Sequence, residues 1–87
     1  LLNNYLLVLN QIKTLKEKLK IYDENINIYD NLIKTTKESI KAGSATYLDL
    51  EVLENSKSAA VLNKQIISYQ IQKQLLNLYY KLISFKN

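Results

Sequence analysis

The chain has a single glycine, Gly43, and no proline, so one position interrupts a sequence that otherwise reads as helix. Gly43 lies at the middle of the 87 residues. Glycine adopts positive φ without steric cost and favours the position just past a helix end. One break between two segments of similar length predicts an all-α, long antiparallel two-helix coiled-coil hairpin. We expect helices over 1–41 and 47–86, with a tip at 42–46.

Residues on both sides of Gly43 agree with this turn. Lys41 precedes it, and lysine is favourable at the negative C-terminal end of a helix. Thr46 and Asp49 follow with the spacing of a capping box, in which the threonine hydroxyl accepts a backbone N–H near the start of the new helix and the carboxylate reaches back to the cap. Ser44 is an alternative N-cap. The tip is the one place where the backbone departs from helix, so function should concentrate there.

The first segment carries apolar residues at alternating spacings of four and three, which is typical of a coiled-coil seam. Only one member of the series, Thr36, is polar. The predicted seam is Leu1, Tyr5, Val8, Ile12, Leu15, Leu19, Tyr22, Ile26, Tyr29, Ile33, Thr36 and Ile40.

The second segment carries two apolar stripes, which predicts packing against more than one neighbour. One stripe is Leu48, Val52, Ala59, Leu62, Ile66, Tyr69, Leu76, Tyr80 and Ile83, and the other is Leu50, Leu53, Ala60, Ile67, Ile71, Leu75, Leu78, Leu82 and Phe85. Small residues at Ser56, Ser58, Ala59 and Ala60 would let a neighbouring helix approach closely.

A hairpin of this length is extended and cannot enclose a core, so we expect it to associate with other copies or with the rest of a longer protein. The tyrosines on the stripes are expected to pack as core residues with their hydroxyls at the rim; these are Tyr5, Tyr22, Tyr29, Tyr69 and Tyr80. Tyr47, at the tip, either packs on the turn or contacts a partner.

Several functional classes find no support in the composition. The chain has no cysteine and no histidine, and it lacks a nucleophile–base pair or a phosphate-binding glycine loop, so we expect neither an enzyme nor a cofactor or metal. The net charge of +4 comes from scattered lysines without arginine, which favours a solvated helix face over a nucleic-acid site. The longest apolar run, 5–9, is far short of the ~20 residues that span a bilayer.

The stretch from Ile40 to Leu53 resembles the hairpin tip of the TolC-like outer-membrane efflux duct family. In that family a glycine at the turn is followed by Ser or Thr, then a hydrophobic pair, then Asp six residues after the glycine. Gly43, Ser44 and Asp49 stand at that spacing, and two long amphipathic arms flank them.

The resemblance implies a periplasmic segment of a Gram-negative outer-membrane protein. Three subunits, each contributing two hairpins, would form a closed cylinder of helices that exports drugs or proteins. The tips would dock on the hairpins of a periplasmic adaptor protein. By position, the adaptor-contacting tip would comprise Ala42, Gly43, Ser44, Thr46 and Tyr47, and Asp49 would line the aperture.

Two other readings stay open. The chain is alternatively a structural coiled-coil hairpin for protein–protein association, including the hairpin of the adaptor itself. The tip of the adaptor family uses an Arg-Leu-Ser pattern, and this chain has no arginine. A lysine-rich module that binds nucleic acid or membrane is the third reading, and steep salt dependence of binding would reveal it.

Overall fold

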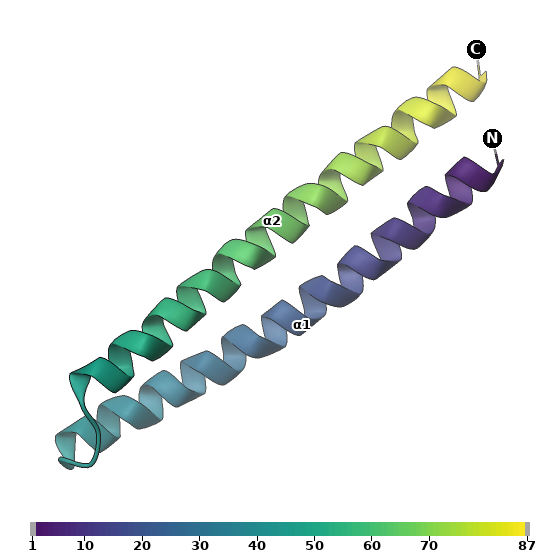
Figure 1. The fold of residues 1–87 in the computed structure, drawn as a ribbon. Helices are drawn as coiled ribbons and strands as arrows, with labels where there is room; N and C mark the ends of the chain where they lie inside the picture. Colours follow the sequence, from purple (N-terminus) through teal and green to yellow (C-terminus); the bar gives the residue numbers. More distant parts are fainter. Residues whose placement is uncertain (1, 87) are drawn as a thin grey trace.

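The protein is an extended antiparallel hairpin of two long helices (Figure 1). The computed structural model describes the backbone from Leu2 to Lys86 and the side chains as far as Ser84. Helix α1 spans Leu2–Lys41 and helix α2 spans Tyr47–Lys86. The hairpin measures 68 × 14 × 12 Å, and the first residues of α1 and the last residues of α2 lie at the end opposite the tip. The predicted all-α hairpin is confirmed.

The predicted seam of α1 is the face that packs on α2. From Tyr5 to Ile40 every member of the series is buried or half-buried, with Val8 and Ile12 the most buried at 4% and 6% exposure. Leu1 lies outside the described residues. A 3–4 spacing keeps one stripe facing a single partner helix along the whole length of the contact. The sequence pattern therefore identified the packing face of α1 residue by residue.

Only one of the two stripes on α2 faces α1. The prediction is wrong for Leu75 and Leu82 of this stripe, which are 47% and 50% exposed, and the side chain of Phe85 lies outside the described residues. The buried and half-buried residues on this side recur at spacings of three and four, and we call them the inner seam. The inner seam consists of Leu50, Leu53, Lys57, Ala60, Lys64, Ile67, Ile71, Gln74, Leu78 and Lys81. Four of its ten members are lysine or glutamine, so the hairpin packs through the more polar stripe of α2.

The apolar interior is small. Among the described side chains only five are buried, namely Val8, Ile12, Ala60, Ile67 and Ile71. Two helices can shield only a narrow strip between them, and large apolar side chains elsewhere on both helices remain exposed. This agrees with the expectation that the hairpin cannot enclose a core.

Two ion pairs join the helices at inner-seam lysines. Lys57 Nζ lies 2.6 Å from Asp30 Oδ1, and Lys64 Nζ lies 2.5 Å from Asp23 Oδ1. The two aspartates are one heptad apart, and so are the two lysines. Because all four side chains are more than a third exposed, each pair adds little to stability, about 0–1 kcal/mol.

The same pairs select the register of the hairpin. A slip of one heptad in one direction would place Lys57 opposite Lys37, and a slip in the other direction would place Lys64 opposite Lys16. Both alternatives put like charges together, which is unfavourable. The observed register is the one in which both lysines meet a carboxylate, and it holds the tip residues in place relative to both helices.

Neither helix has a stretch long and apolar enough to cross a membrane within the described residues.

Candidate functional site

The tip begins with a Schellman motif that ends α1. Gly43 has φ +80°, its N–H donates to Ile40 O at 3.0 Å, and the N–H of Ser44 donates to Ser39 O at 2.9 Å. These two bonds satisfy carbonyls that the helix end would otherwise leave free. The Ser44 hydroxyl also donates to Ser39 O, at 3.2 Å. Ser44 thus closes α1, and the suggestion that it caps α2 is wrong.

The capping box predicted at the start of α2 is present. The Thr46 N–H donates to Asp49 Oδ2 at 2.9 Å, and the Asp49 N–H donates to Thr46 Oγ1 at 3.3 Å. The first helical bond follows directly, from Leu50 N–H to Thr46 O at 3.3 Å. The backbone N–H of Thr46, and secondly its hydroxyl, stabilise the carboxylate and hold the pKa of Asp49 below its ordinary value.

The turn brings the five candidate tip residues to one end of the molecule, and all of them are exposed: Ala42, Gly43, Ser44, Thr46 and Tyr47. Tyr47 is 76% exposed, so it does not pack on the turn. Asp49 is also exposed and lies in the first turn of α2. The tip thus presents small side chains and hydroxyls next to one large, free aromatic ring.

A second candidate surface runs along the edge of α2 that faces away from α1. It contains the first of the two predicted stripes, and two polar residues complete its 3–4 spacing. This outer seam consists of Leu48, Val52, Asn55, Ala59, Leu62, Ile66, Tyr69, Lys73, Leu76, Tyr80 and Ile83, and all its members are exposed. Its large apolar side chains are 37–67% exposed.

The expectation that Tyr69 and Tyr80 pack as core residues is therefore wrong for the hairpin, whereas Tyr5, Tyr22 and Tyr29 are half-buried as expected.

Helix α1 carries a weaker apolar row, which lies between its outer edge and the side that bears Gln11 and Lys18. Leu7, Ile21 and Ile28 recur at multiples of seven residues and are 54–56% exposed. Thr14 and Thr35 occupy the same row. The positions of α1 directly opposite its seam are polar and exposed, namely Asn10, Glu17, Glu24, Asn31 and Glu38, so only the outer edge of α2 is continuously apolar.

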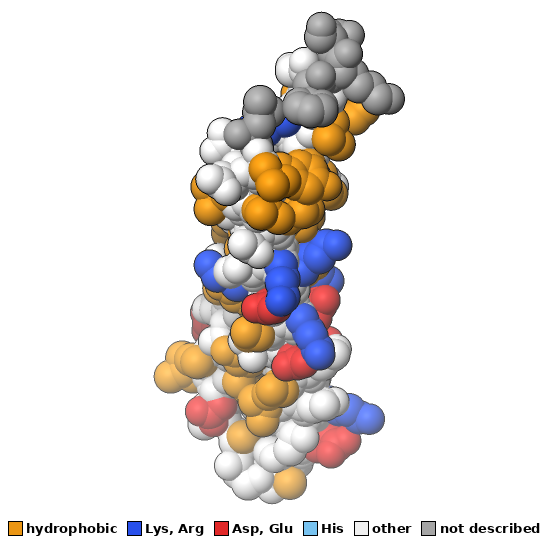
Figure 2. All heavy atoms as spheres, turned by 90° about the vertical axis from the view of Figure 1, so that its right-hand side faces the viewer, with side chains coloured by type: hydrophobic (Ala, Val, Ile, Leu, Met, Phe, Trp, Pro, Cys, Tyr) orange, Lys and Arg blue, Asp and Glu red, His pale blue; other side chains and the backbone are white. Residues whose placement is uncertain are grey.

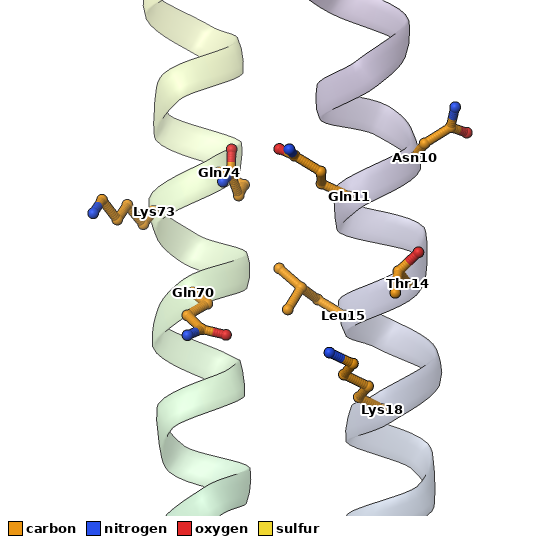
Figure 3. Close-up of a pocket in the computed structure, with 8 residues that line it drawn as sticks. All are labelled: Asn10, Gln11, Thr14, Leu15, Lys18, Gln70, Lys73 and Gln74. Atoms are coloured by element: carbon orange, nitrogen blue, oxygen red, sulfur yellow. The ribbon is translucent and has the colours of Figure 1, made fainter.

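The two broad faces between these edges differ in charge. One carries a shallow groove lined by Asn10, Gln11, Thr14, Leu15, Lys18, Gln70, Lys73 and Gln74. Figure 3 shows Gln11 and Gln74 projecting toward one another across it, and Gln74 Oε1 is buried without a hydrogen-bond partner in the hairpin. We call this the amide face.

The opposite broad face, the charged face, carries a groove lined by Asp30, Ile33, Lys34, Lys37, Glu54, Lys57 and Ser58. Figure 2, which views the hairpin from another side, shows charged side chains at mid-length and in the lower third, with hydrophobic side chains above and among them. The described residues contain no group of side chains that could hold a metal ion.

The sequence reading missed the polar members of both seams. Asn55 and Lys73 complete the outer seam, and Lys57 and Lys64 belong to the inner seam. The available signal was the equal heptad spacing of the lysines and of Asp23 and Asp30, which predicts two matched pairs in an antiparallel register.

No family model matches the chain, and no curated protein or solved structure matches it either.

Proposed function

We propose that this hairpin is one of several that form the periplasmic helical wall of an outer-membrane export duct of the TolC-like kind. We also propose that its tip docks on the hairpin of an adaptor protein. The observation that carries the proposal is the pair of heptad seams on α2. One seam is occupied by α1, and the other is apolar, exposed and continuous over the whole helix. A helix with two seams is built to have two neighbours.

The angle between the seams favours a curved wall over a compact bundle. The outer seam is displaced from the inner seam by two residues, as Leu48 and Leu50 illustrate. At 3.5 residues per turn each residue turns by about 103°, so the seams lie about 206° apart on one side of the helix and about 154° on the other. A closed ring of about twelve helices, the number the resemblance implies, needs about 150° between neighbours.

Burial of the outer seam supplies the driving force for assembly. Fully burying one large aliphatic side chain contributes about 1.5–3 kcal/mol, and the outer seam holds several that are around half exposed, including Leu48, Leu62 and Leu76. Ala59 on the outer seam and Ala60 on the inner seam lie side by side in the sequence, so neighbours can approach closely on both sides at the same level. On α1, the row of Leu7, Ile21 and Ile28 offers a smaller apolar surface for such a contact.

The tip suits a small, repeated contact. Gly43, Ser44 and Thr46 present little side-chain bulk, and Tyr47 offers an aromatic anchor. One such contact is weak, and repetition around a ring would supply the affinity.

The test of docking is Ser44→Trp in the full-length protein, with Ser44→Ala as the matched control. Ser44→Ala removes the hydroxyl bond to Ser39 without adding bulk, so transport should be near normal. Ser44→Trp should abolish drug efflux or secretion while the protein still inserts in the outer membrane and stays folded. Normal transport by Ser44→Trp would refute tip docking and leave the hairpin as a structural coiled coil, the second candidate function.

A further inference from the structure

We propose that the amide face of the hairpin lines the lumen of the duct and that the charged face forms its outer surface. The inference rests on the proposed function, because it assumes a closed wall of hairpins. It assigns each exposed residue of α2 to the inside or the outside of that wall.

The first argument is geometric. In a closed ring, the directions from one helix to its two neighbours enclose an angle below 180° on one side of that helix. This side faces the axis of the ring. For α2 this is the side on which the two seams lie about 154° apart. The residues at its centre are equidistant from both seams and recur every seven positions. This column is Asp49, Ser56, Asn63, Gln70, Asn77 and Ser84.

The column belongs to the amide face. Gln70 lines the groove of that face together with Gln11 and Lys18 of α1 (Figure 3). Across the groove, α1 presents a corresponding row at heptad spacing from Asn4 through Gln11 and Lys18 to Asn25. The α1 row continues through Leu32 and Ser39, so both helices turn mainly amides and hydroxyls to this side, and the groove itself carries two charges, Lys18 and Lys73.

The second argument is electrostatic and independent of the first. Rotational symmetry repeats every side chain around a ring, so each charge on the inner wall faces its own copies across a confined space. Like charges repel, and that repulsion is costly where water and counterions are restricted. On the outer surface the copies point away from one another, and salt screens them over about 8–10 Å. The face whose groove carries fewer charges, only Lys18 and Lys73, therefore belongs inside, and the face carrying Asp30, Lys34, Lys37 and Glu54 belongs outside.

Such a lining suits transport of hydrated cargo. Amides and hydroxyls exchange hydrogen bonds with water and with cargo at little net energy. They offer neither an apolar surface nor a fixed charge to retain a passing molecule. The single acid of the column, Asp49, lies at the tip, where the wall ends.

The test uses cysteine accessibility, which is simple because the chain has no native cysteine. Gln70→Cys places the thiol at the centre of the amide face, and Gln72→Cys places it on the opposite side. Both native residues are exposed glutamines two positions apart, so they are matched controls. Asn63→Cys and Gln65→Cys form a second matched pair. Leu62→Cys, on the outer seam, reports the packing of neighbouring hairpins.

Each variant is made in the full-length protein in outer-membrane preparations and treated with a small methanethiosulfonate or with a maleimide on a polymer too large to enter the duct. Cysteines at 65 and 72 should react with both reagents. Cysteines at 63 and 70 should react with the small reagent and at least an order of magnitude more slowly with the large one. The cysteine at 62 should be protected from both.

The two proposals fail differently. If the cysteine at 62 reacts with the large reagent as fast as that at 72, the hairpins are not packed edge to edge. Both proposals, the duct and the assignment of its lining, are then wrong. If the cysteine at 62 is protected but those at 70 and 72 react alike or in the reverse order, the wall exists and the assignment of its faces is wrong.

Discussion

Replacing Gly43 with alanine tests the turn on which the whole arrangement depends. Gly43 has φ +80°, a conformation that costs a residue with Cβ about 1–2 kcal/mol. A Cβ built at this position meets no atom within 4 Å, so no steric clash adds to that cost. We therefore expect Gly43→Ala to lower the free energy of unfolding by about 1–2 kcal/mol, entirely through the backbone dihedral.

Urea and thermal unfolding followed by circular dichroism measure this change. For a chain of this size the expected loss corresponds to a decrease in Tm of about 4–16 °C, since 1 kcal/mol shifts Tm by about 4–8 °C. All variants must be compared at one protein concentration, because self-association changes the apparent stability. Gly43→Asn is the control, since asparagine tolerates the left-handed region better than alanine does.

The order of stability should be parent, then Gly43→Asn, then Gly43→Ala. Equal stability of all three would show that the turn does not need positive φ at this position. An equal loss in both variants would show that the cost comes from side-chain bulk, which contradicts the open space around Gly43.

Four further outcomes are expected. Thr46→Ala should lower the free energy of unfolding by about 0.5–2 kcal/mol through loss of the cap, and an unchanged urea midpoint would contradict the capping box. Because folding lowers the pKa of Asp49, the ionised carboxylate stabilises the fold above its unfolded pKa of about 3.9, and this stabilisation is lost as the pH falls through the folded pKa. In an acid titration, the difference in stability between the parent and Asp49→Asn should therefore shrink over that pH range. A double-mutant cycle with Asp30→Ala and Lys57→Ala should give a coupling of about 0.2–1 kcal/mol, smaller at high salt, and no coupling at low salt would argue against the ion pair. Leu62→Glu should shift the isolated chain toward monomer in sedimentation equilibrium while its helicity is kept, whereas a parent chain that is already a helical monomer would disprove lateral association.

The sequence was sufficient to predict the turn and the packing face of α1, because both depend on local rules. A lone glycine, followed by a threonine and an aspartate at capping-box spacing, specifies where one helix ends and the next begins. A single unbroken heptad stripe specifies which side of α1 meets its partner. These signals involve residues close in the chain, so no knowledge of the other helix was needed.

The packing face of α2 could not be predicted in the same way, because two stripes compete for one partner. Hydrophobicity favours the outer stripe, yet the structure turns the stripe with Lys57 and Lys64 toward α1. Asp23 and Asp30 offer both lysines a carboxylate at once only in the observed antiparallel register, which favours this arrangement by about 0–1 kcal/mol per pair. Sequence reasoning that treats each helix alone does not contain this information.

The arrangement of the two stripes also bears on the assembled state. An isolated hairpin would gain more by burying the apolar stripe of α2 inside and exposing its lysines to water. The observed arrangement, with Leu62, Ile66 and Leu76 outside, is favourable when a second neighbour covers them. In the proposed wall, lysines paired with α1 would hold the register within a hairpin, and the outer seam would supply the energy of association between hairpins. The polar composition of the inner seam is therefore itself an argument that the hairpin is one part of a larger helical wall.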